Sequence, residues 1–145
     1  RSIVPIRGYR KRGRLAWPFS LMTLRWTVDH DRKRVLAIAE GDVTRAQFDA
    51  YLDAMASEDA LTYPKLFDGT AGDTSMDAYE LLGVAARIRS SHDRPVGPVA
   101  IVLPEDKSHL VLPVLGALAA ARRPLKFFSS LEPARRWIDS LEYSG

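Results

Sequence analysis

The hydrophobic positions of the chain alternate with polar ones in its first regular stretch. Residues 23–28 place Leu24, Trp26 and Val28 on one side, which predicts a half-buried strand. A polar turn follows, and residues 35–39 then form a second apolar run. Two short strands separated by a polar turn predict an antiparallel hairpin.

Helical spacing begins after Gly41 and Asp42 interrupt the second strand. Thr44 and Gln47 have the spacing of a capping box, so a helix is expected from Thr44 to about Ser57. Its apolar face is predicted to hold Phe48, Tyr51, Leu52 and Met55. Its outer face is predicted to hold Arg45, Asp49 and Asp53.

Three further units each combine an apolar run with a helical pattern. The predicted strands are 66–67, 98–103 and 125–128. The predicted helices run from Thr74 or Ser75 to Ser90, over 110–122, and from the cap Ser130 through Leu131, Ala134, Trp137, Ile138 and Leu141. Residues 98–103 are apolar almost throughout, which is typical of a strand inside a parallel sheet. The order β-β-α-β-α-β-α-β-α predicts an α/β sandwich, with a mainly parallel sheet and one antiparallel edge strand.

Composition restricts the class of protein further. The 145 residues suit one globular domain, expected over 22–145, with 46% hydrophobic and 27% charged residues. The absence of cysteine excludes disulfides, thiolate metal sites and cysteine nucleophiles, and a cytoplasmic location is expected. No apolar run reaches the ~20 residues that cross a bilayer.

Charge is unevenly distributed. Residues 1–23 hold six of the 21 basic residues and no acid, which leaves 15 basic against 18 acidic residues elsewhere. Residues 1–21 are predicted to be an extension, a linker or leader, with Met22 well placed as a native start. The alternative is a basic arm that contacts nucleic acid or an anionic membrane surface.

The residues with the most potential chemistry follow the predicted strand at 66–67. They are Asp68, Gly69, Gly72, Asp73, Thr74, Ser75 and Asp77. The glycines predict a tight turn, after which the two hydroxyls lie at a helix N-terminus. Free N–H groups there favour an added anion. In the alternative, Thr74 or Ser75 is only the N-cap, and Asp77 completes a box-like arrangement.

Signals for catalysis, metals or cofactors do not stand out. His30, His92 and His109 lie far apart in predicted loops, and no nucleophile elbow, Walker or dinucleotide pattern occurs. The run from Asp68 to Asp73 has too few oxygen ligands in register for a calcium loop. The sequence therefore supports no enzymatic activity, no metal and no cofactor.

The order of elements resembles the STAS domain, the fold of bacterial anti-sigma-factor antagonists, in the wider STAS/SEC14 group. The segments that carry the resemblance are 35–44, 66–68, 99–102 and 126–137. The resemblance implies a non-enzymatic regulatory domain that binds a protein partner. It also implies phosphorylation of a hydroxyl near the family's Asp-Ser-Ser-Gly motif, here Asp73-Thr74-Ser75-Met76, so Ser75 and Thr74 are the candidate phosphoacceptors.

A second function class stays open beside the first. The SEC14 part of the resemblance implies a small apolar or lipid-like ligand held between helices. The candidate pocket residues are Met76, Tyr79, Leu110, Val111 and Leu115. Self-association as a homodimer, through an edge strand or a helix face, is a third class.

Overall fold

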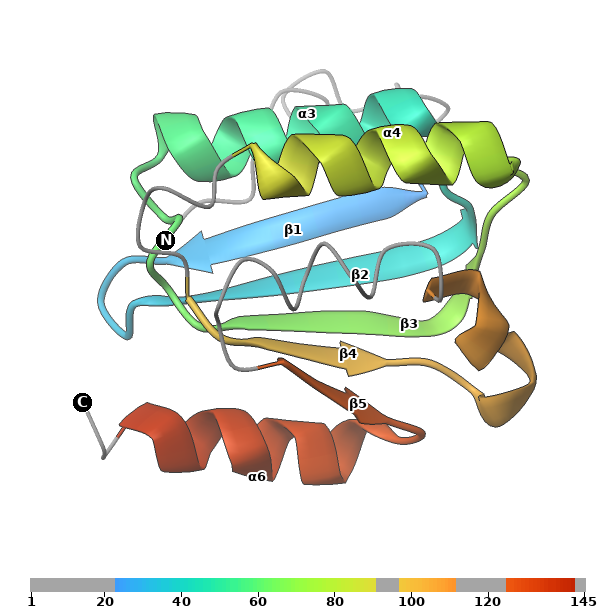
Figure 1. Cartoon of the computed structure of the whole chain (residues 1–145). Coiled ribbons are helices and arrows are strands. Elements are labelled where there is room, and N and C mark those ends of the chain that lie inside the picture. The colour runs from blue at the N-terminus through green and yellow to red at the C-terminus, as the bar shows by residue number, and fades with distance from the viewer. Residues whose placement is uncertain (1–22, 91–96, 112–124, 143–145) are drawn as a thin grey trace, which may run out of the picture.

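The computed structural model describes residues 23–90, 97–111 and 125–142 (Figure 1). The predicted extension over 1–21, most of the predicted helix over 110–122 and residue Leu115 lie outside this part of the chain. The described residues form one sheet with helices on both of its faces.

The sheet has five strands in the order β1-β2-β3-β4-β5. They are β1 (Leu24–Asp29), β2 (Arg34–Asp42), β3 (Lys65–Asp73), β4 (Val99–Val102) and β5 (Leu125–Phe128). β1 pairs with β2 antiparallel, and every later pair is parallel. The predicted α/β class, with a mainly parallel sheet and one antiparallel edge strand, is confirmed.

Helices pack on the sheet from opposite sides. They are α3 (Arg45–Ser57), α4 (Ala78–Arg89) and α6 (Leu131–Glu142), while the 3-10 helix η1 (Glu105–Val111) follows β4 in the chain. α3 and α4 lie side by side over one face of the sheet, whereas α6 packs against the other (Figure 1). Ala134 and Ile138 of α6 are buried together with Ala100 and Val102 of β4.

The alternation along each strand explains these two layers. Val99 and Ile101 pack on the side of α4, while Ala100 and Val102 pack on the side of α6. All four residues of β4 are therefore buried, as its continuous apolar sequence predicts. At the hairpin edge, β1 has one buried face, which agrees with its alternating pattern.

The cap predicted for the first helix is confirmed. The Thr44 side chain accepts a hydrogen bond from the Gln47 backbone N–H (3.2 Å) and caps α3. Helix α6 begins at Leu131, directly after Ser130. The residues between β4 and the helix predicted over 110–122 are partly helical, since η1 covers Glu105–Val111.

The largest correction concerns the predicted glycine turn and the helix start after it. Gly69 and Gly72 do not form a tight turn, because β3 continues to Asp73 and pairs with the last residues of β2. Helix α4 then begins at Ala78 with Asp77 as its N-cap, not at Thr74 or Ser75. Pairing with β2 keeps this segment extended, and the helix can begin only after the chain has left the sheet.

Candidate functional site

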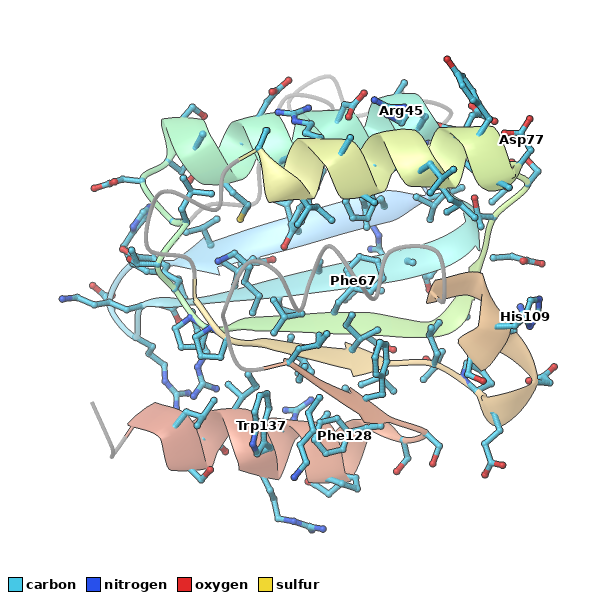
Figure 2. All side chains as sticks on the ribbon, viewed as in Figure 1. Arg45, Phe67, Asp77, His109, Phe128 and Trp137 are labelled. Atoms are coloured by element: carbon cyan, nitrogen blue, oxygen red, sulfur yellow. The ribbon has the colours of Figure 1, made fainter. Side chains whose placement is uncertain are left out.

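The candidate site lies where β2 and β3 end and the chain crosses to α4. Asp42 and Asp73 are register partners at the ends of these two strands. The loop from Thr74 to Asp77 follows directly, at an edge of the sheet where parallel strands place their carboxyl ends. Figure 2 shows Asp77 at the start of α4, at the same end of the molecule as His109 of η1.

Ser75 is exposed and is held by a single carboxylate. Its backbone N–H donates to Asp42 Oδ1 (2.6 Å), and its hydroxyl donates to Asp42 Oδ2 (3.0 Å). The two contacts fasten the loop to the end of β2. The Ser75 hydroxyl nevertheless faces solvent, where another molecule can reach it.

Thr74 has a different, structural position. Its hydroxyl donates to the backbone carbonyl of Val43 (2.7 Å) and accepts from the Met76 N–H (3.1 Å). Both bonds are part-buried. Of the two predicted phosphoacceptors, Ser75 is the accessible one and Thr74 ties the loop to the core.

The other predicted loop residues have separate tasks. Asp77 accepts from the Glu80 N–H (2.9 Å) as the cap of α4. Asp68 accepts from the Thr70 N–H and hydroxyl on the outer part of β3. Lys107 of η1 reaches this region: its ammonium donates to the Gly72 carbonyl (2.9 Å) and lies 3.7 Å from Asp73 Oδ2.

Helix α4 presents an apolar stripe to solvent directly after the loop. Tyr79 is 84% exposed and Leu82 is 57% exposed, and Ala86 is also exposed. The spacing of three and four residues places these side chains on one face. The prediction that Tyr79 lines an internal pocket is therefore wrong, because its side chain points to the opposite side of the helix from the core.

A cavity of about 180 Å³ lies between α3, α4 and the sheet. Its walls include Leu52 and Met55 of α3, Leu81, Val84 and Ile88 of α4, and Phe67 and Ile101 of the sheet. Met76 also lines it, as the sequence suggested, together with Thr74. The side chains of Leu110 and Val111 and the whole of Leu115 lie outside the described part of the chain.

A charge network that the sequence did not predict joins α3 and α4. Arg87 of α4 donates to Asp49 Oδ1 (3.1 Å) and also pairs with Asp53, while Arg45 pairs with Asp49 within α3. The pKa of Arg87 is raised, chiefly by its hydrogen bond to Asp53, although partial burial opposes the shift. The sequence signal for this contact was the presence of acidic residues on α3, Asp49 and Asp53, and of the basic residue Arg87 on α4.

The histidines do not converge on the site. His30 Nδ1 lies 2.8 Å from the Tyr63 hydroxyl at the hairpin end, and His92 lies outside the described residues. Within 23–90, 97–111 and 125–142, no three His, Asp or Glu side chains are arranged to hold a metal ion. Over the same residues, no helix has the length and apolar character needed to cross a bilayer.

Comparison of the chain with models of protein families, with curated proteins and with solved structures gives no match. The class that the fold defines is an α/β domain with a mainly parallel five-stranded sheet. Membership of the STAS family stays a prediction from the order of the elements and from the residues within them.

Proposed function

We propose that this chain is a non-enzymatic regulatory domain, of the STAS type, that binds a protein partner through α4 and is switched at Ser75. The observation that carries the proposal is a juxtaposition. In the loop before α4, an exposed serine held by one aspartate lies only a few residues ahead of an exposed apolar stripe on α4.

The stripe suits a partner surface. Tyr79, Leu82 and Ala86 give α4 an apolar outer face in addition to the inner face that it buries on the sheet. The outer face of a helix on a sheet is ordinarily polar. Apolar anchors at this spacing are typical of helices that dock into an apolar groove, and tyrosine is frequent among the residues that dominate binding energy.

The contacts of Ser75 suggest how a phosphate would act. A phosphate adds about 1.5 to 2 negative charges at neutral pH and replaces the hydroxyl proton that Asp42 now accepts. The phosphate and the Asp42 carboxylate, both negatively charged, would then face each other where a hydrogen bond now joins Ser75 to Asp42. The repulsion would release the loop from β2 and disturb the start of α4, immediately before Tyr79.

The resemblance supports the same position. Asp73-Thr74-Ser75 keeps the acid and the two hydroxyls of the antagonist motif, with Met76 in the place of its glycine. The unphosphorylated form, with its loop fastened, is proposed as the form that binds the partner.

The test begins by capturing partners from the native cells with the wild-type domain as bait. The captured protein is then purified, and its affinity is measured by calorimetry for wild type and three variants. Leu82→Asp and Ser75→Asp are each expected to weaken binding about tenfold or more, which corresponds to about 1.4 kcal/mol. Ser130→Asp, an exposed serine just before α6, is the matched control and should bind like wild type.

Weaker partner binding by both Leu82→Asp and Ser75→Asp, with the Ser130→Asp control unchanged, supports both the binding surface on α4 and the switch at Ser75. Loss in Leu82→Asp alone would keep the surface and remove Ser75 from the mechanism. Wild-type affinity in both variants would overturn the proposal.

A further inference from the structure

We infer that the cavity between α3, α4 and the sheet is a binding site for a small, neutral, apolar molecule of about the size of a single aromatic ring. This inference rests on the cavity itself and does not depend on the switch proposed for Ser75. It also narrows the ligand class more sharply than the sequence does.

The cavity is partly open to solvent, so its volume sets the size of the group that it can enclose. At about 180 Å³ the cavity is close to an engineered protein cavity of about 150 Å³ that stays dry and binds benzene. A two-chain phospholipid is many times larger. The cavity therefore suits one ring or a short branched alkyl group.

The walls set the polarity of the ligand. Leu52 and Met55 from α3 and Val84 from α4 face Phe67 and Ile101 across the cavity, so most of the lining is hydrocarbon. Placing a charge in such surroundings without a partner is strongly unfavourable. A neutral apolar molecule has no charge to desolvate on entry, and it gains the contacts that an empty cavity lacks.

The polar groups in the lining already have partners. The buried Lys65 ammonium donates to the carbonyls of Leu61 (2.8 Å) and Tyr63 (2.7 Å). The Thr74 hydroxyl is bonded to Val43, and the Asp73 carboxylate lies 3.7 Å from Lys107. These groups need no hydrogen bond from a ligand.

The cavity also has a cause in the sequence. Gly69 and Gly72 line it and contribute no side chain, and Ala39 contributes one methyl group. Side chains are missing here because β3 lies close to its neighbours. A Cβ atom at Gly69 would lie 2.8 Å from Leu103, and one at Gly72 would lie 2.7 Å from the Ala39 methyl group. The two glycines therefore add no side chain to this part of the cavity wall.

The test uses benzene as the probe, and benzoate as a charged molecule of similar shape. Benzene is titrated into wild type while amide resonances are followed by NMR and the melting temperature is recorded. We expect saturable shifts for Phe67, Val84 and Ile101 and a higher melting temperature. Benzoate should bind at least tenfold more weakly.

A matched pair of variants tests whether the space is real. Val84→Phe fills the cavity from α4, while Val28→Phe makes the same change at a buried position that does not line the cavity. Val84→Phe should keep or raise the melting temperature and lose benzene binding. Val28→Phe should lower the melting temperature, because a filled core has no room for the larger ring.

Several results would overturn the inference. They are an absence of saturable benzene shifts in wild type, benzoate binding as tight as that of benzene, and a Val84→Phe protein that melts as low as Val28→Phe while binding benzene normally. If Val84→Phe does not fold, Val84→Leu replaces it. Leucine fills less of the cavity than phenylalanine, so Val84→Leu should weaken benzene binding several-fold. An unchanged affinity for benzene would contradict the inferred binding site.

Discussion

At Gly72 the backbone of β3 passes so close to β2 that no side chain fits between them. A Cβ atom there would lie 2.7 Å from the Ala39 Cβ atom and 3.4 Å from the Ala39 carbonyl oxygen. Both atoms belong to a paired strand and have little freedom to move. Glycine is needed here for close approach, whereas Gly41 on the neighbouring strand has a positive φ of 86°.

Gly72→Ala is therefore expected to destabilise the domain by about 1–3 kcal/mol, the usual cost of overpacking. Urea unfolding followed by circular dichroism measures the change. The matched control is Gly83→Ala in α4, where the added methyl group meets only the end of the flexible Arg45 side chain. The control should be neutral or stabilised, because alanine favours a helix over glycine by about 1 kcal/mol. Equal stability of the Gly72→Ala protein and wild type would show that the strands can separate there.

At the scale of elements, the sequence predicted correctly those features whose signals lie in residues close together in the chain. The hairpin, the buried strand β4 and the cap of α3 are set by neighbouring residues, and all were predicted correctly. The length of β3 was not, because Gly, Asp and Thr at its end resemble a turn. Pairing with β2, which is distant in sequence, keeps them extended.

The prediction of where α4 begins was wrong for a related reason. Asp73, Thr74, Ser75 and Asp77 are all residue types that cap helices, so composition alone does not choose between them. The choice is made by contacts outside the segment: Thr74 bonds to Val43 and Ser75 to Asp42, which leaves Asp77 as the cap.

The capping role of Asp77 can be tested directly. Asp77→Ala should lower the free energy of unfolding by about 1 kcal/mol, because the Glu80 N–H loses its acceptor. Asp77→Asn keeps an oxygen acceptor and should cost less than half as much. Urea unfolding of the two variants and wild type measures the difference. If Asp77→Ala were as stable as wild type, the helix would have another cap.

At the scale of the whole molecule, one segment separates two different surfaces. Thr74 and Met76 line the cavity, whereas Ser75 faces solvent beside Asp42. The same division continues along α4, where Leu81 and Val84 face the cavity while Leu82 faces outward. No pattern in the sequence reveals a cavity, because it depends on how well three separate elements fill the space between them.

This shared wall predicts that events at Ser75 and in the cavity are coupled, and coupling between two sites is reciprocal. A negative charge at Ser75 should repel Asp42 and loosen the loop that holds Thr74 and Met76 against the cavity. Ser75→Asp should therefore weaken benzene binding about fivefold or more, and benzene should slow amide hydrogen exchange of the loop in wild type. NMR titration and exchange measurements on both proteins check the two directions, with Ser130→Asp as the control. Identical benzene affinity in Ser75→Asp and wild type, with unchanged loop exchange, would mean that the two surfaces act independently.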